Sequence, residues 1–241
     1  MNDMPDLPEL PDAPPPGPAP VVLLHGAGQM PTMWQSQVEA LGAGTKAIAP
    51  WIEGMRPGRR HDVSLTEASA ALLSTFELNG IKRARVVAHQ FGAMVALQTA
   101  ADAPDRIERM VISGAVVLPG RVALAVQKAL VKFVPATQLA EAGVTRDALL
   151  QALDVMAHAD FSARLGSINT PTLVVCCEGD QAGRAYAGML AERMPNAELR
   201  LVPGSSSAPM AAAPDIYNAL MTRFLGTSPN ESNDPDPRDA S

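Results

Sequence analysis

Short apolar runs alternate with longer amphipathic stretches along the middle of the chain. Each run is apolar at nearly every position, which is typical of strands buried on both faces of a sheet. We therefore predict strands at residues 21–24, 46–49, 85–88, 110–113, 172–177 and 199–202. Helices are predicted between them, at residues 31–41, 66–78, 91–103, 182–194 and 214–225. This alternation predicts an α/β fold, with a mostly parallel sheet of about six strands, helices on both faces, and ligands beyond the carboxyl ends of the strands.

The two ends of the chain have a different composition. Residues 1–20 contain eight prolines, which fix φ and remove backbone donors, and residues 226–241 are polar and interrupted by proline. We expect both to be disordered tails around a domain at residues 21–225. A proline-rich tail is able to dock on an SH3-type groove, and a plain solvating tail is the simpler interpretation.

The charge of the chain lies mainly in these tails. The formal net charge is −6, with −4 in residues 1–20 and −3 in residues 226–241, which leaves about +1 for the domain. Nothing in this distribution favours binding to nucleic acid or to an anionic membrane. No apolar run approaches the roughly 20 residues that span a bilayer, and no secretory signal is visible, so we expect a cytoplasmic protein. The adjacent Cys176 and Cys177 indicate packed thiols on a strand; we expect no metal and no cofactor.

The most specific motif is AHQFG at residues 88–92, which directly joins a predicted strand to a predicted helix. Small residues two positions before and after the centre suit a sharp turn in which the central residue, Gln90, has a strained backbone. The motif resembles the nucleophile elbow of the α/β-hydrolase superfamily, usually Gly-x-Ser-x-Gly, with Ala88 and Gly92 at the small positions.

Three further segments resemble that family, in the family's order. VVLLHGAGQMPTMW resembles its His-Gly turn, PTLVVCCEGDQAG the strand that delivers its catalytic acid, and LRLVPGSSSAPM the loop that carries its catalytic histidine. The resemblance covers about residues 20–226 and places Asp180 at the acid position. Gly204 and Pro209 match the last motif, and the histidine position falls on Ser207.

The resemblance also implies backbone donors and a cap. The two N–H groups of the family's oxyanion hole would belong to Ala27 and Phe91, and a change of side chain does not remove them. The family's cap insertion corresponds to about residues 116–168, where we expect a small cap of two or three helices that leaves the site open. Two of these cap helices are expected at residues 121–134 and 145–159. The family usually begins with an antiparallel hairpin, and the proline-rich tail stands in its place here.

The residues at the triad-equivalent positions are unsuited to triad chemistry. Gln90 has no comparable proton to lose and is a poor nucleophile, and the hydroxyl of Ser207 is far too weak a base near neutral pH. Triad knock-outs lose on the order of 10⁶ in rate, so ordinary Ser-His-Asp hydrolysis is not expected.

Other histidines are candidate substitute bases, and each also has a structural explanation. His158 ends a predicted cap helix and is able to overhang the site, and the helix dipole favours a histidine there. His89 precedes the elbow residue and is simply explained as packed beside the turn. His25 is explained as a structural residue of the His-Gly turn. His61 is explained as an exposed residue of a loop.

Three functional hypotheses remain open. The first is a small-molecule binding protein, or a regulator of a partner, without triad chemistry; its ligand would be mainly apolar. The second is an enzyme with other chemistry in the same crevice, such as a lyase, isomerase or cyclase. The third is a weak ester hydrolase with a substituted base.

Overall fold

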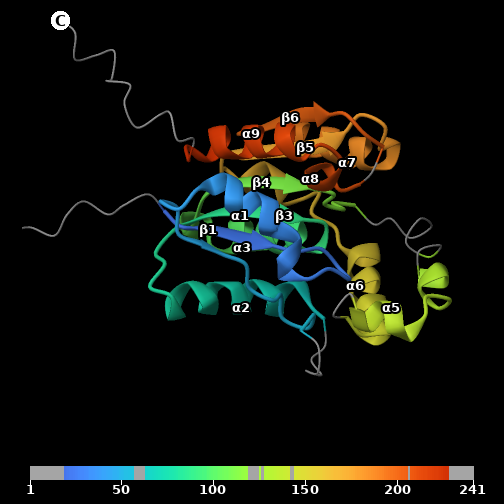
Figure 1. Cartoon of the computed structure of the whole chain (residues 1–241). Helices are drawn as coiled ribbons and strands as arrows, with labels where there is room; N and C mark the ends of the chain where they lie inside the picture. Colours follow the sequence, from blue (N-terminus) through green and yellow to red (C-terminus); the bar gives the residue numbers. More distant parts are fainter. Residues whose placement is uncertain are drawn as a thin grey trace, which may run out of the picture.

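In the part of the chain that the structure describes, six strands form one parallel sheet in the order β2-β1-β3-β4-β5-β6 (Figure 1). The computed structural model describes residues 19–56, 63–118, 125, 128–141, 144–205 and 207–227. The strands are β1 (Val21–Leu24), β2 (Ala47–Ile48), β3 (Ala84–His89), β4 (Ile107–Ser113), β5 (Thr172–Cys177) and β6 (Ala197–Val202). The chain runs outward from β1 to β2 and then returns to β3 on the other side of β1. This reversal of strand order creates a crevice at the carboxyl ends of β1 and β3.

Helices cover both faces of the sheet. The α-helices are α1 (Gln35–Leu41), α2 (Leu65–Leu78), α3 (Phe91–Asp102), α5 (Ala136–Glu141), α6 (Arg146–His158), α7 (Gln181–Arg193), α8 (Pro209–Ala212) and α9 (Pro214–Leu225). Among the described residues, three 3₁₀ turns are also present: η1 (Pro31–Trp34), η2 (Pro104–Arg106) and η3 (Leu165–Ser167). None of the helices in the described part of the chain combines the length and the apolar character that a membrane crossing requires.

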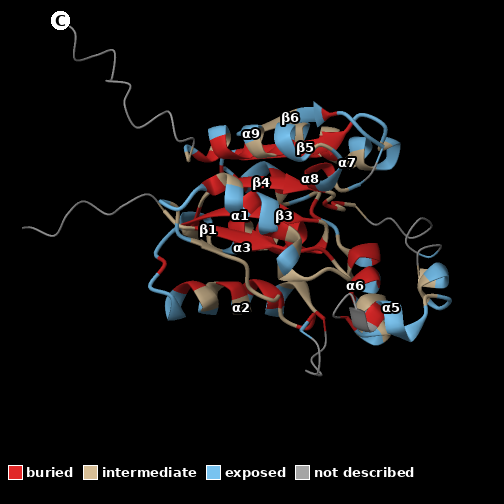
Figure 2. Cartoon of the chain, in the orientation of Figure 1, coloured by how far each residue is buried: buried red, intermediate tan, exposed pale blue. Residues whose placement is uncertain are grey.

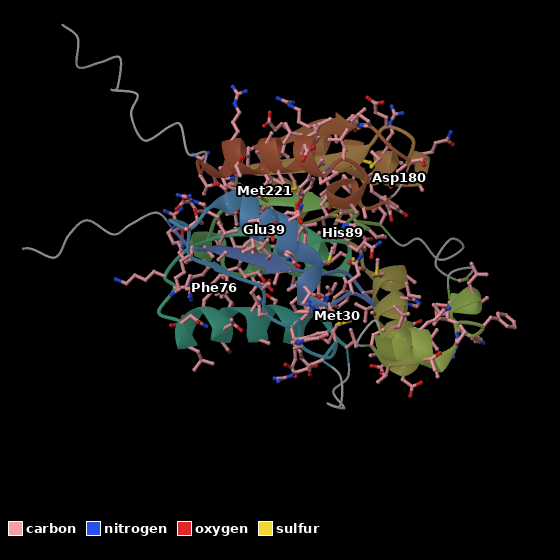
Figure 3. The ribbon with its side chains drawn as sticks, viewed as in Figure 1. Met30, Glu39, Phe76, His89, Asp180 and Met221 are labelled. Carbon is pink, nitrogen blue, oxygen red and sulfur yellow. The ribbon has the colours of Figure 1, made fainter. Side chains whose placement is uncertain are left out.

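The core has two layers, one on each face of the sheet. Phe76 of α2 belongs to the layer that also contains the buried side chains of α3, α6 and α7. Met221 of α9 belongs to the other layer, together with residues of α1 and α8. Figure 3 shows Phe76 and Met221 on opposite sides of the sheet. Figure 2 shows that the central strands and α3 are buried, whereas α7 and α9 are exposed along their outer faces.

The predicted α/β fold is confirmed, and every predicted strand and helix overlaps an observed one. Strand β6 differs in burial, because Arg200 and Leu201 are exposed at the edge of the sheet. The apolar run at residues 199–202 was expected to be buried on both faces, and that interpretation is wrong for an edge strand. The short helix α8 was not predicted from the sequence.

The segment between β4 and β5 holds α5 and α6, which lie together beside the end of the sheet to which the strand arrows point (Figure 1). Helix α6 matches the second predicted cap helix. Only part of the first, residues 121–134, is described, and its residues 128–131 are helical. The predicted disordered tails lie almost wholly outside the described residues.

Candidate ligand site at the carboxyl ends of the strands

The turn between β3 and α3 has a strained backbone at Gln90. Its φ of 46° and ψ of −115° make it the only non-glycine residue with positive φ in the described part of the chain. The Gln90 N–H donates to the carbonyl of Ser113, 2.8 Å away, which ties the turn to the neighbouring strand. Gly92 is required by close packing, because a Cβ atom there would lie 2.4 Å from the carbonyl oxygen of Leu24. This geometry agrees with the elbow expected from the motif.

Two glycines enclose the side chain of Gln90. A Cβ atom on Gly114 would lie 3.1 Å from Cγ of Gln90, and a Cβ atom on Gly26 would lie 2.8 Å from its Oε1. The carboxamide has no hydrogen-bond partner among the described residues, although it can both donate and accept. The Gln90 amide is therefore held in place by packing and remains available to a ligand.

The turn after β1 presents a second group of donors. The Gly26 N–H donates to Oε1 of Gln29 at 2.9 Å, whereas the N–H groups of Ala27 and Phe91 have no acceptor among the residues the structure describes. Buried His25 braces this turn. Its Nε2 accepts the N–H of Ile52 at 3.2 Å, so its Nδ1 carries the proton and donates to the carbonyl of Gly26 at 2.9 Å. Burial lowers the pKa of His25, which keeps the ring neutral in this arrangement.

Asp180 follows β5 and caps the first turn of α7. Its carboxylate accepts the N–H of Gly183 at 2.9 Å. An acceptor at this position satisfies one of the free N–H groups of the helix and lies at the positive end of its dipole. Asp180 therefore has a structural role that is complete without any catalytic partner.

One cavity of about 450 Å³ brings the predicted positions together. Gln90, Asp180 and Ser207, the residues at the three predicted triad-equivalent positions, line it with Ala27 and Tyr186. Its remaining walls are almost entirely apolar: Gly114, Val116, Leu130, Val131, Val134, Leu149, Leu153, Met156, Ala182 and Gly183. We call this space the Gln90 cavity. It lies at the carboxyl ends of β1, β3 and β5, where Figure 3 shows Asp180.

Neither predicted substitute base is among the described residues that line the Gln90 cavity. His89 is fully buried, its Nδ1 lies 2.9 Å from Oγ of Ser113, and burial lowers its pKa to about 4. The side chain of His158 is 58% exposed, and its Nδ1 lies 2.8 Å from the carbonyl oxygen of Asp154. His25 also lies outside the lining, and His61 falls outside the described residues.

The cysteines and the acidic side chains give no sign of further chemistry. Burial raises the pKa of the Cys176 thiol to about 11, which opposes thiolate formation, and neither cysteine lines the cavity. The described residues contain no group of three His, Cys, Asp or Glu side chains placed to hold a metal ion.

Several residues of the site were missed by the sequence reading. Tyr186 lies six residues after Asp180, about 1.7 turns along α7, and Gln29 follows the His-Gly turn. On α6, Leu149, Leu153 and Met156 recur at the spacing of one helix face and line the cavity. His158 comes two residues after Met156, about 200° around the helix, which directs it away from that face. The periodicity of α6 alone was therefore enough to predict that His158 lies away from the face that lines the cavity.

Known proteins resemble this chain over most of its length. Residues 21–220 match the model of the family described as "Alpha/beta hydrolase family". A protein of Azorhizobium caulinodans named putative carbamate hydrolase RutD is 25% identical, covering 86% of this chain and 91% of its own. A hydrolase from Pseudomonas aeruginosa has a similar structure, with a TM-score of 0.75 and 19% sequence identity. The match covers 86% of this chain and 90% of that hydrolase. A hydrolase from Oleispira antarctica also has a similar structure, with a TM-score of 0.73 and 15% sequence identity. The match covers 88% of this chain and 92% of that hydrolase.

Proposed function

Since the chain belongs to the alpha/beta hydrolase family, we propose that it binds a small, mainly apolar molecule in the Gln90 cavity without Ser-His-Asp chemistry. The observation that carries this proposal is the residue at the elbow: a glutamine stands where a nucleophile would stand, in the strained backbone typical of that position. An amide nitrogen shares its lone pair with the carbonyl and does not attack an ester, and Ser207 supplies no base for such an attack.

The lining of the cavity supports a neutral carbonyl compound with an apolar body. The walls from α6 and residues 130–134 offer apolar surface to most of a ligand. At the polar end, the N–H groups of Ala27 and Phe91 and the carboxamide of Gln90 supply donors for a carbonyl oxygen. The carboxylate of Asp180 lies in the same cavity and disfavours an anionic ligand.

A second candidate function is catalysis without a covalent nucleophile. The N–H groups of Ala27 and Phe91, which have no acceptor in the described part of the chain, favour this candidate. Such donors stabilise negative charge that develops on a carbonyl oxygen. In a lyase, isomerase or cyclase of this kind, Gln90 would position the substrate or a water molecule. Weak hydrolysis with a substituted base has less support, because no described histidine lines the cavity.

Restoring the two triad residues tests the proposal. We expect Gln90→Ser combined with Ser207→His to raise the hydrolysis of p-nitrophenyl acetate at least about 100-fold over the parent chain. Each single change is the matched control and leaves one of the two groups missing, so neither is expected to gain activity. A folded double variant without any gain would overturn the triad-equivalent assignment of positions 90 and 207.

Labelling of the parent chain tests the absence of a serine nucleophile directly. A fluorophosphonate reacts with activated serines, and we expect no stoichiometric adduct by mass spectrometry of the intact chain. An adduct at Ser207, located by peptide mapping, would instead support the weak hydrolase.

A further inference from the structure

Strand β6 forms one border of the sheet, because β5 is its only neighbour among the described strands (Figure 1). The opposite border, β2, has two residues, whereas β6 has six. A long open edge offers unpaired backbone groups to another strand, and charged side chains, proline or a bulge often protect such an edge. The charges on β6 are Glu198 and Arg200, and their order makes the strand complementary to a second copy of itself.

The odd-numbered residues of β6 direct their backbone groups toward the open edge. On the inner side, the N–H of Thr172 donates to the carbonyl of Asn196 at 2.9 Å, and the N–H of Glu178 donates to that of Val202 at 2.9 Å. The register between β5 and β6 advances one residue at a time between these two hydrogen bonds. Because the direction of the backbone groups alternates along a strand, the even-numbered residues face β5 and the odd-numbered residues face outward.

Most of these outward groups have no partner in the described part of the chain. The N–H groups of Leu199 and Leu201 and the carbonyl of Ala197 form no hydrogen bond with any described residue. The carbonyl of Leu199 accepts from the guanidinium of Arg200 at 3.1 Å and keeps a second lone pair. The N–H of Ala197 is already used, since it donates to the carbonyl of Met194 at 3.3 Å.

We propose that the open edge of β6 pairs with the same edge of a second copy of this chain, antiparallel and with the two-fold axis at Leu199. In this register Leu199 lies opposite Leu199 of the second copy, and each of the two donates its N–H to the carbonyl of the other. Leu201 lies opposite Ala197 of the second copy and donates to its carbonyl. The pairing therefore uses the outward groups that are free and does not require the occupied N–H of Ala197. It is independent of the proposed function, because β6 contributes no described residue to the Gln90 cavity.

The charged side chains of β6 select this register. Glu198 and Arg200 lie on the same face of the strand, and their side chains are 44% and 52% exposed. With the axis at Leu199, Glu198 of each copy lies opposite Arg200 of the other, at a non-hydrogen-bonded position where side chains lie closest. An axis at Glu198 would place two carboxylates opposite each other, and an axis at Arg200 would do the same with two guanidinium groups. Both arrangements are destabilising.

The other face of β6 supplies apolar contacts. Ala197 and Leu199 pack against the core layer that contains residues of α7, whereas Leu201 is 40% exposed. In the paired strands Leu201 would lie beside Ala197 of the second copy and lose part of this exposure. The interface is narrow, so we expect a reversible dimer that forms at roughly 10–100 µM protein.

Charge reversal followed by sedimentation velocity tests this surface. We expect the full chain to dimerise reversibly between about 5 and 500 µM. Glu198→Arg and Arg200→Glu each place like charges opposite each other, so each should raise the dissociation constant about tenfold or more. Glu39→Arg makes the same change of charge at an exposed position of α1 and should leave the dissociation constant within about twofold.

A mixture of the two charge-reversed chains tests the register. Glu198→Arg has two positive charges on this face of β6 and Arg200→Glu has two negative charges, so opposite charges meet only between unlike chains. We expect the equimolar mixture to form a heterodimer, identified by native mass spectrometry, with an affinity within about threefold of the parent dimer. The double variant Glu198→Arg, Arg200→Glu should dimerise again on its own.

Single cysteines test the same register without a change of charge. In the paired strands, Leu199→Cys places two thiols across the axis, with about 5.5 Å between their Cα atoms. Leu201→Cys places them four residues out of register, about 13 Å apart along the strands. A bismaleimide with a two-carbon spacer should therefore cross-link the first variant and not the second. The native cysteines, Cys176 and Cys177, are buried, so we expect no cross-link in the parent chain.

The outcomes separate the surface from the register. A chain that stays monomeric at about 500 µM would overturn the proposal, and so would a dimer that neither charge reversal weakens. A mixture that does not recover the dimer, or cross-linking of Leu201→Cys in preference to Leu199→Cys, would overturn the register centred on Leu199.

Discussion

The Oε1 atom of Gln90 lies 2.8 Å from the position that a Cβ atom would take on Gly26. A side chain at position 26 would therefore displace the carboxamide, and it would also meet Oε1 of Gln29 at 2.5 Å. Glycine at this position accommodates the larger elbow residue as well as the turn itself. The glutamine is thus packed into its surroundings, in agreement with the proposed role of Gln90 in ligand binding.

The strained elbow predicts an unusual response to glycine at position 90. A non-glycine residue at φ 46° costs about 1–3 kcal/mol, and the carboxamide of Gln90, which has no hydrogen-bond partner among the described residues, returns little of that energy. We expect Gln90→Gly to raise the free energy of unfolding by about 1 kcal/mol, measured by urea denaturation. Gln98→Gly, at a regular position of α3, is the control and should lower it by about 1 kcal/mol. Equal losses in both variants would contradict strain at Gln90.

The close contact beneath the elbow predicts opposite results for two glycines in helices. Gly92→Ala places a Cβ atom 2.4 Å from the carbonyl oxygen of Leu24 and 2.6 Å from that of His25. Since backbone cannot move aside as a flexible side chain does, we expect a loss of about 3 kcal/mol or more. Gly188→Ala in α7 meets nothing within 4 Å and should gain about 1 kcal/mol. Thermal or urea unfolding of the two variants checks both signs.

The sequence was sufficient for the parallel sheet because its strands are short apolar runs separated by helices. The elbow was recognisable because its strain requires small residues at fixed positions around Gln90. The burial of Leu201 was misjudged, since an edge strand and a central strand can have the same apolar pattern.

The walls of the Gln90 cavity were not predicted, because they depend on how α6 and α7 pack. The contact between Gly26 and Gln90 was also not predicted, because the separation of two residues along the sequence does not determine the distance between them in the fold.

Two buried histidines predict a loss of stability in mild acid. Burial lowers the pKa of His89 from 6.5 to about 4 and also lowers that of His25. Between these pH values the unfolded chain takes up protons that the folded chain does not, so stability is full above pH 6.5 and falls as the pH approaches 4. The shift of His89 alone corresponds to about 3 kcal/mol.

Urea midpoints measured between pH 7.5 and 4 check this window. His89→Gln removes one titrating group, so we expect a shallower pH dependence whatever its absolute stability. Lowered pKa values of Asp102, Asp154 and Asp160 reduce stability only from about pH 5 downward, roughly one unit above their ordinary value of 3.8, so they do not account for a loss that begins at pH 6.5. A dependence as steep in His89→Gln as in the parent chain would exclude His89 as the source.

Two substitutions of Asp180 are expected to separate its role as a helix cap from a role in catalysis. Asp180→Asn keeps an oxygen that accepts the Gly183 N–H, whereas Asp180→Ala removes the cap of α7. We expect the alanine variant to lose about 1 kcal/mol of stability and the asparagine variant to lose much less.

In the Gln90→Ser, Ser207→His background, asparagine should still abolish most of the gained ester hydrolysis, because it does not orient and stabilise a protonated histidine. Urea denaturation and p-nitrophenyl acetate turnover, measured on the same preparations, test the two roles. Activity that survives Asp180→Asn would show that Asp180 serves this fold only as the cap of α7.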